Sequence, residues 1–243
     1  MMGLTPQLNT ITGVRAFSTT RHGGVSAAPF ASLNLGSHVG DLPAAVQKNR
    51  QRLVQALKLP HEPCWLNQVH ENTVVRLMSG ACADTPEADA SYTNVKGTVL
   101  AIQTADCLPI LLAADDGSEI AAIHSGWRSL AAGIIRATLE QFSSSPQRIH
   151  AWLGPAIGSE HFEVGDDVRS AMLDLNTEHE SAFKPYGEKY LADLTAIASQ
   201  TLRSLGVNTI EASQICTYAN AEDYFSFRRD GQTGRMASLI WME

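Results

Sequence analysis

The sequence has few cysteines and no long apolar run, and each shortage excludes a class of protein. Its four cysteines include no Cys-x-x-Cys pair, which argues against a disulfide scaffold and leaves free thiols in a cytoplasmic protein as the expectation. The longest uninterrupted apolar run, residues 108–114, is far shorter than the roughly 20 residues of a membrane span. No basic stretch followed by an apolar one opens the chain, so no secretory signal is expected.

Charged residues are also few, and acidic residues outnumber basic ones. Only 18% of the 243 residues are charged, with 18 Lys and Arg against 25 Asp and Glu and a net charge of −7. Soluble domains carry about 25% charged residues. An acidic chain without a clustered basic face is not expected to bind nucleic acid. The hydrophobic share of 44% is enough to bury a core, so disorder is excluded.

The chain shows no boundary between domains. It contains no repeat, no low-complexity tract and no linker, and its densest group of helix breakers, residues 143–146, is one loop. We therefore expect residues 1–243 to form a single domain. The predicted strands and helices do not alternate regularly, so an α+β fold with mixed sheets and outer helices fits better than a doubly wound sheet.

Hydrophobic periodicity gives a coarse map of the elements. Strands are expected at residues 14–19, 64–69, 73–78, 98–104, 109–114, 119–123, 148–153 and 235–242, with 109–114 and 119–123 paired as a hairpin. Helices are expected at residues 41–57, 129–142, 166–175 and 190–205, and residues 20–41 are expected to form a loop.

Three side chains that can bind metal stand where predicted strands end. His70, Cys107 and His124 each follow an apolar run and precede a turn or helix, so they are placed to meet in a cleft. Two histidines and one cysteine supply the three protein ligands of a catalytic zinc site, which keeps a fourth position open. Their spacing matches no zinc finger, so buried structural roles stay open on spacing alone.

Two further segments have the composition of anion or base sites. Arg21 stands beside a glycine pair, where a guanidinium and backbone N–H groups can approach an anion together; a plain surface turn is the alternative. In residues 224–235, aromatic side chains precede paired arginines, which suits base stacking and phosphate binding. Two strands around a charged turn would explain the same composition.

Seven motifs in chain order resemble one family. They are TTRHGGVS from Thr19, SLNLGSHVGD from Ser32, Asn49–Arg50, NQVH from Asn67, TADCLP from Thr104, HSGWR from His124 and FSFRRDGQTGR from Phe225. The chain resembles the YfiH or laccase-domain family, also called multicopper polyphenol oxidase-like and purine nucleoside phosphorylase-like, from about Val14 to Ile240. It departs from the family at Ser125, where alanine is frequent, and at Ser129, where glycine is usual.

The resemblance implies a sandwich of mixed β-sheets flanked by helices, with His70, Cys107 and His124 as ligands of one zinc ion per chain. It also implies phosphorolysis of purine nucleosides, including methylthioadenosine, and deamination of adenosine. The partners would then be purine nucleosides and inorganic phosphate. Copper is a plausible substitute because it binds such ligands more tightly than zinc does.

Roles for other motif residues follow from that activity as expectations. Arg21 is the first choice for the phosphate, and Asn34 and Gln68 are candidates for contacting the ribose or base. Arg128 is a further candidate for substrate binding. Asp106 is a candidate general acid or base. Since it neighbours Cys107 in an extended segment, its side chain is expected on the opposite face, where it would instead orient a neighbour.

Other functions remain open on the same residues. Cys107 could be a nucleophile with His124 or His70 as its base, which would make the protein a cysteine hydrolase or an amidase that edits peptidoglycan precursors. A copper-dependent polyphenol oxidase would need more clustered imidazoles than eight histidines without a His-x-His pair provide. A zinc-stabilised interaction module is a third alternative. The sequence leaves open the preferred purine, the native metal and whether the chain forms a homodimer.

Overall fold

The computed structural model describes residues 2–78, 80, 82 and 84–243 and contains three sheets. The four-stranded sheet has the order β1 (Gly3–Leu4), β2 (Val14–Thr19), β13 (Met236–Met242) and β5 (Val99–Thr104). The six-stranded sheet has the order β12 (Thr209–Ala212), β8 (Ile149–Leu153), β6 (Leu108–Ala114), β7 (Ile120–Ser125), β4 (Ala90–Thr93) and β3 (Val74–Arg76). The three-stranded sheet has the order β10 (Phe183–Tyr186), β11 (Lys189–Ala192) and β9 (Glu163–Val164).

Six α-helices and three short 3₁₀ helices complete the described part of the chain. The α-helices are α1 (Pro43–Leu57), α2 (Trp127–Ala131), α3 (Ile134–Leu139), α4 (Asp166–Leu175), α5 (Leu194–Ser204) and α6 (Phe227–Asp230). The 3₁₀ helices are η1 (Gln7–Thr10), η2 (Pro146–Arg148) and η3 (Thr177–Ala182). Most strand pairs are antiparallel, while β12 with β8 and β3 with β4 are parallel. The predicted α+β class with mixed sheets is confirmed.

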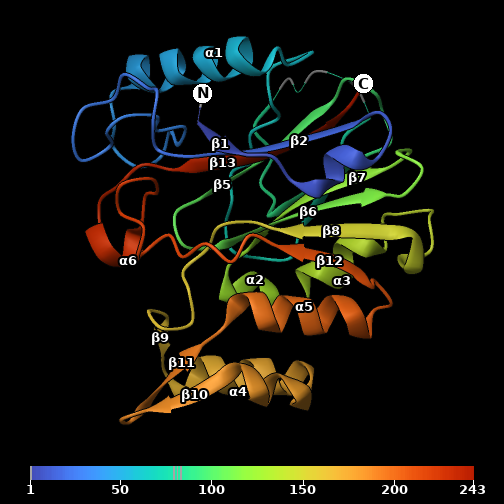
Figure 1. The fold of residues 1–243 in the computed structure, drawn as a ribbon, viewed down its shortest axis with the longest axis vertical. Helices are drawn as coiled ribbons and strands as arrows, with labels where there is room; N and C mark the ends of the chain where they lie inside the picture. Colours follow the sequence, from blue (N-terminus) through green and yellow to red (C-terminus); the bar gives the residue numbers. More distant parts are fainter. Residues whose placement is uncertain (1, 79, 81, 83) are drawn as a thin grey trace.

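The two larger sheets lie in the middle of the molecule and helices cover their outer faces. Figure 1 shows α1 over the four-stranded sheet, α2, α3 and α5 under the six-stranded sheet, and the small sheet with α4 at the far end. Three apolar clusters correspond to these layers: one between the sheets, one under α1 and one between the six-stranded sheet and the lower helices. The molecule is therefore a helix–sheet–sheet–helix sandwich.

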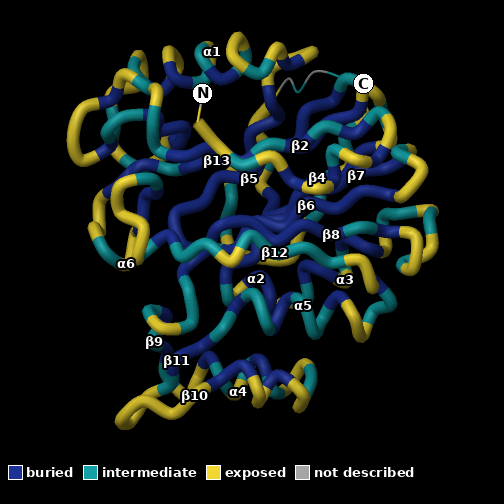
Figure 2. The backbone as a smooth tube through the Cα atoms, viewed as in Figure 1, coloured by how far each residue is buried: buried dark blue, intermediate teal, exposed yellow. Residues whose placement is uncertain are grey.

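Strand β6 shows why the central strands are almost continuously apolar. Leu108, Ile110 and Leu112 belong to the cluster with the lower helices, whereas Leu111 and Ala113 belong to the cluster between the sheets. Because successive side chains point to opposite faces, a strand covered on both faces has no position for a solvated side chain. Figure 2 shows this buried centre as a continuous dark band.

Several predicted elements are confirmed almost to the residue. Strands β2, β5, β8 and β13, helix α4 and the body of helix α1 lie where the periodicity placed them. The predicted hairpin is present, with Ile110 opposite Ile123 and Ala113 opposite Ile120. No helix in the described residues is long and apolar enough to cross a membrane.

The helix predicted at residues 190–205 is wrong at its start. Residues 189–192 form β11, and the helix begins only at Leu194, after Asp193 accepts a hydrogen bond of 2.9 Å from the Ala196 N–H. Leu191 has helical spacing to Leu194, but it pairs with Lys184 and Glu163 in the small sheet. Tertiary pairing has overridden the local pattern.

Three other predictions also needed correction. The helix expected at residues 129–142 breaks at Gly133, whose φ of +83° ends α2 and starts α3. Residues 64–69 form only isolated bridges, so they are not a strand. The periodicity missed β4, a strand of four residues whose side chains are all buried.

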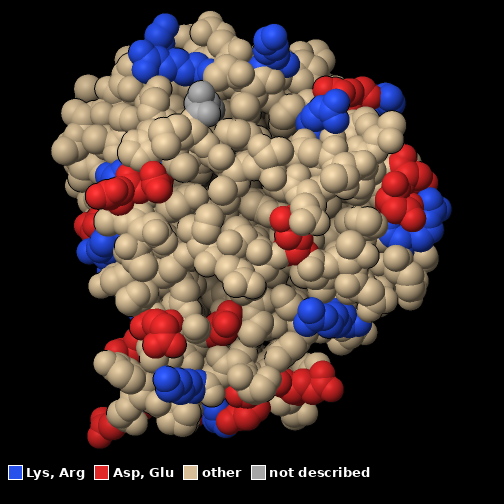
Figure 3. Space-filling view, viewed as in Figure 1, with Lys and Arg blue, Asp and Glu red and all other residues tan. Residues whose placement is uncertain are grey.

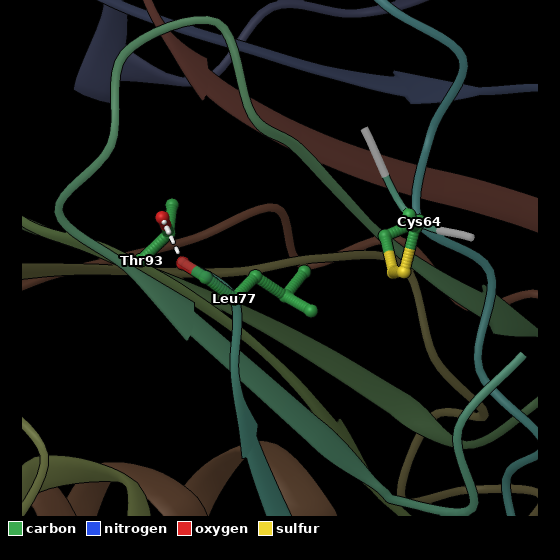
Figure 4. The surroundings of a disulfide bond; sticks show 4 residues. Cys64, Leu77 and Thr93 are labelled. Carbon is green, nitrogen blue, oxygen red and sulfur yellow. Dashed lines mark hydrogen bonds between the residues drawn. A yellow bond between two sulfur atoms is a disulfide. The ribbon is translucent and has the colours of Figure 1, made fainter. Parts of the chain in front are cut away.

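The expectation of four free thiols is also wrong. Cys64 and Cys82 form a disulfide with their Cα atoms 5.2 Å apart, while Cys107 and Cys216 are free. Figure 4 shows this bond close to the segment where Thr93 donates a hydrogen bond of 2.7 Å to the carbonyl of Leu77. The two cysteines are 18 residues apart in the chain, so their proximity arises from tertiary folding that spacing could not reveal.

Charged side chains are dispersed over the surface. On the face drawn in Figure 3, acidic and basic groups stand in small mixed clusters, and no continuous basic area appears. This face therefore offers no surface of the kind that nucleic acids bind.

Replacing Asp193 by Ala should lower the free energy of unfolding by about 1 kcal/mol, because the Ala196 N–H at the start of α5 would lose its acceptor. Urea unfolding followed by circular dichroism measures the change. Asp193→Asn keeps an acceptor and is the control. Equal losses in both variants would show that the cap is not the cause.

Candidate metal centre and its cavity

The three predicted metal ligands lie together at one end of the sandwich. The ligand atoms of His70, Cys107 and His124 all lie within 4.8 Å of one another. The Cys107 Sγ is 3.9 Å from the His70 Nε2, and the two imidazole rings are nearly perpendicular with centroids 4.7 Å apart. The convergence predicted from the strand ends is confirmed.

The β6–β7 hairpin brings two of these residues together. His124 in β7 pairs with Pro109 in β6, so Cys107, which directly precedes β6, lies at the same end of the hairpin. His70 comes from the loop before β3 and has a φ of +65°, in the left-handed region. Such a conformation is costly for a residue with a side chain and persists only where surrounding contacts impose it.

The buried carboxylate of Asp89 imposes the arrangement of both histidines. Its oxygens accept hydrogen bonds from the backbone N–H groups of Val69, His70 and Glu71, at 3.2, 3.0 and 2.8 Å. They also bind the Nδ1 of His124 at 2.7 Å. Burial raises the pKa of Asp89, but these hydrogen bonds outweigh that effect and hold the pKa below its usual value.

The carboxylate also determines which imidazole nitrogen of His124 is available. Since Nδ1 is bound to Asp89, the Nε2 of His124 is the nitrogen available to bind a metal ion together with His70 and Cys107. Metal-binding histidines usually have this carboxylate partner, which fixes their orientation and tautomer. Asp89 was not identified from the sequence, although its place before a short buried strand was a weak signal.

Cys107 and His124 form a pair with shifted pKa values. Burial opposes charge on the Cys107 thiol, but the nearby His124 outweighs it and lowers the Cys107 pKa to about 6. Burial also opposes charge on His124, while the Cys107 thiolate and the Asp89 hydrogen bond raise the His124 pKa to about 9. The metal-free pair is therefore a thiolate and an imidazolium at neutral pH.

Gly126 leaves the room that the three side chains need. A Cβ at this position would lie 3.1 Å from the Cys107 Sγ, 3.1 Å from the His70 Cδ2 and 3.8 Å from the His124 Cε1. Since its backbone is extended, at φ −65° and ψ 161°, the requirement for glycine is space and not conformational freedom.

The donor set fits a zinc or copper ion. Zinc accepts thiolate and imidazole ligands at about 2.0–2.3 Å, which places tetrahedral ligand atoms roughly 3.5 Å apart. The three ligand atoms need to approach one another by only about 1 Å from their widest separation to reach that geometry. Three donors leave a fourth position for water or substrate.

The group faces a cavity of about 200 Å³. Its lining residues are His38, Gln68, His70, Gln103, Thr104, Ala105, Cys107, His124, Phe227 and Arg235. An outer cavity of about 310 Å³ shares His38, Phe227 and Arg235 with it and extends to the loop 231–233. The two cavities together can accommodate a molecule larger than a metal-bound water.

Arg21 does not line either cavity. Its guanidinium donates to the carbonyls of Ala31 and Ala221, both at 2.9 Å, and stacks over the Phe225 ring at 4.6 Å. Burial lowers its pKa. These contacts tie the loop after β2 to the C-terminal segment, and Arg21 is not among the residues that line the two cavities.

Asn34 is fully buried and links backbone segments. Its amide nitrogen donates to the Gly36 carbonyl and to the Asp41 carboxylate, at 3.1 and 2.9 Å. Its oxygen accepts from the backbone N–H groups of Gly36 and Arg235, both at 2.9 Å. With both ends of its amide engaged, Asn34 positions the segment that carries Arg235.

Asp106 has a similar supporting position. Its carboxylate accepts hydrogen bonds from the hydroxyls of Thr217 and Ser226, at 2.7 and 3.0 Å, and from the Arg228 N–H at 2.7 Å. Its φ of +93° turns the chain just before Cys107. Arg128, the remaining candidate, is exposed, stacks over the neighbouring Trp127 ring at 4.3 Å and is not among the residues that line the two cavities.

Arg235, His38 and Phe227 line both cavities but were not singled out from the sequence. Burial lowers the pKa of Arg235 and of His38, and the Arg235 charge lowers that of His38 further. All three belong to motifs that carried the resemblance, so the motifs contained them without distinguishing their roles. The Arg235 Nη1 donates to the carbonyls of Thr233 and Gly234.

Comparison with known proteins finds one family model and several relatives that cover nearly the whole chain. The model of the family described as multi-copper polyphenol oxidoreductase laccase matches residues 15–243. A protein of Escherichia coli named purine nucleoside phosphorylase YfiH is 49% identical over 239 residues, 98% of each chain. One of Haemophilus influenzae named purine nucleoside phosphorylase is 45% identical over 246 residues and the full length of both. The crystal structure of Neisseria meningitidis protein NMB0706 has a TM-score of 0.94 and 42% identity, covering 99% of each chain.

Replacing Gly126 by Ala should weaken zinc binding by about 10-fold or more, because the added methyl group meets two of the three ligand residues. Competition with a chelating dye measures the affinity. Gly158→Ala is the matched control, since its Cβ would crowd Cys216 at the same 3.1 Å and has none of the three ligand residues within 4 Å among its nearest contacts. Equal loss in both variants would refute the steric argument.

Zinc binding at pH 7.5 should release about one proton. Between pH values of about 6 and 9 the free pair carries its single proton on His124, whereas a bound metal requires a thiolate and a neutral imidazole. The contribution of the Cys107–His124 pair to this release should rise towards two protons below pH 6 and fall towards none above pH 9. Titration calorimetry in buffers of different ionisation enthalpy measures it, and no release at pH 7.5 would contradict the assigned pair.

Proposed function

Because the chain belongs to the multi-copper polyphenol oxidoreductase laccase family, and relatives covering its whole length are named purine nucleoside phosphorylases, we propose that it is a metal-dependent purine nucleoside phosphorylase. The observation that carries the proposal is the cavity itself, which three candidate metal donors and the half-buried Arg235 line together. Zinc is the proposed metal, and copper can occupy the same donors.

The reaction requires phosphate and nucleoside side by side. A phosphate oxygen forms a bond to the ribose anomeric carbon while the bond to the purine nitrogen breaks. The base leaves with that electron pair, gains a proton and is released with ribose 1-phosphate. Catalysis of this kind depends on holding both reactants in line.

Arg235 is the proposed phosphate-binding residue in place of Arg21. Arg235 lines both cavities, whereas Arg21 lines neither and its guanidinium donates to the carbonyls of Ala31 and Ala221. Guanidinium groups bind phosphate through paired N–H donors. His38 lies on the same wall as a neutral hydrogen-bonding group, and the exposed ring of Phe227 at the mouth suits stacking of the base.

Zinc held by His70, Cys107 and His124 would supply a Lewis acid that polarises a substrate atom or lowers the pKa of water. The second property suits deamination of adenosine, which we propose as an accompanying activity together with phosphorolysis of methylthioadenosine. Asp89 holds two of the ligands, and Asp106 holds the segments around Thr217 and Arg228. The contacts of Asn34 and Asp106 support positioning roles for both.

A cysteine hydrolase is the second candidate, and one observation favours it. The Cys107 thiolate beside the His124 imidazolium is the state that nucleophilic cysteines adopt. Incubation of the metal-loaded protein with inosine and phosphate, with and without a chelator, separates the two. Release of base and ribose 1-phosphate that the chelator abolishes supports the phosphorylase. Untouched purines, with cleavage of a peptidoglycan amide that alkylation abolishes, would refute it.

Arg235→Met should raise the KM for phosphate by about 10-fold or more while changing the KM for inosine much less, because the proposed partner of the anion is lost. Initial rates at varied phosphate measure the effect. Arg136→Met is the control, since Arg136 is exposed on α3 and lies outside both cavities. An unchanged KM for phosphate would remove Arg235 from the phosphate site.

A further inference from the structure

One polar side chain in the cavity has no role in the metal centre or in phosphate binding. Gln103 lies on β5, where Val99 and Ala101 on the same face pack into the apolar cluster under α1. The alternation would continue with an apolar residue at position 103. Instead, an amide that is only 4% exposed stands at the wall of the metal cavity.

The Gln103 side chain has no partner among the described residues. Its Oε1 is buried without a hydrogen-bond donor. A buried acceptor without a partner costs stability that an apolar side chain of similar size would not. Unpaired polar groups of this kind in a folded protein call for a ligand or another specific explanation.

The neighbouring Gln68 does not donate to that oxygen, because its amide is bonded to the Gln103 backbone instead. The Gln68 Nε2 donates to the Gln103 carbonyl and the Gln68 Oε1 accepts from the Gln103 N–H, both at 2.8 Å. Strand β5 is the edge of its sheet, so Gln68 caps the free backbone groups of that edge. The sequence suggested Gln68 as a substrate contact, but its amide binds the Gln103 backbone. The side-chain amide oxygen of Gln103 is therefore the group that remains available to a ligand.

We propose that the amide oxygen of Gln103 accepts a hydrogen bond from the nucleoside, which makes Gln103 a specificity-determining residue. The proposal rests on the proposed function. The partner must be a donor, whereas phosphate presents mainly acceptor oxygens, so a nucleoside fits the requirement better. A nucleoside carries suitable donors on its ribose hydroxyls and on the Watson–Crick edge of its base. Gln103 thus recognises the nucleoside while Arg235 recognises the anion.

The test compares Gln103→Met with Gln200→Met. The Oε1 of Gln200 is also buried without a partner, but Gln200 lines a separate cleft beside α5. With Gln103→Met we expect the KM for adenosine to rise about 10-fold, the KM for phosphate to stay within about twofold, and the unfolding temperature of the metal-free protein to increase. Gln200→Met should change neither KM. Gln103→Glu, which keeps an acceptor, should retain most of the affinity for adenosine.

Two substrate analogues identify the donor. If the effect of Gln103→Met disappears with purine riboside, which lacks the 6-amino group, the donor is on the base. If it disappears with 2′-deoxyadenosine, the donor is the 2′-hydroxyl. If it persists with both, another ribose hydroxyl is the donor, and each of these results supports the contact.

An unchanged KM for adenosine in Gln103→Met would overturn the inference while leaving the phosphorylase function intact. So would an equal rise in both KM values accompanied by loss of zinc or a lower unfolding temperature, because that pattern indicates a structural role. A wild-type protein that does not act on purine nucleosides would overturn the proposed function and this inference with it.

Discussion

The buried carboxylate of Asp89 is the interaction on which the site depends. It accepts three backbone N–H groups from the loop that carries His70 and also binds the imidazole of His124. A charge with no solvent exposure is tolerable only when such partners surround it. The same hydrogen bonds fix the loop, the tautomer of one ligand and the left-handed backbone of the other, so the centre is built before any metal binds.

The sandwich supplies the rigid frame for that arrangement. Strands β6 and β7 are buried on both faces, and their hairpin register fixes Cys107 and His124 at one end. Part of the cavity wall, Phe227 and Arg235, comes from the segment before β13, which Asn34 and Asp106 hold in place through backbone contacts. Precise catalytic geometry requires support of this kind, because a ligand or arginine displaced by about 1 Å loses its function.

The sequence predicted what strand periodicity and side-chain chemistry can encode. The central hairpin, α1, α4 and the convergence of three side chains were predicted because apolar runs mark buried strands and their ends mark a shared edge. The proposed role of those side chains as metal ligands came from the family resemblance. The sequence did not reveal which arginine faces the cavity, because Arg21 and Arg235 have equally suitable local sequences. The tertiary structure distinguishes them, because Arg235 lines both cavities whereas Arg21 donates to the carbonyls of Ala31 and Ala221. The start of α5 and the Cys64–Cys82 disulfide were not predicted either, because both depend on tertiary contacts that the local sequence does not reveal.

The proposed phosphate site lies on an acidic chain, so the positive charge that attracts the anion must come from residues close to it. The net charge of −7 repels an anion at long range, but charges separated by more than about 10 Å are screened in physiological salt. Within the metal-free cavity the relevant charges are the Cys107 thiolate and the two cations that it attracts, the His124 imidazolium and the Arg235 guanidinium. A metal cation bound to the thiolate would neutralise its negative charge and leave Arg235 free to bind the anion. Metal binding and phosphate binding are therefore expected to reinforce each other, although the two ligands need not touch the same residue.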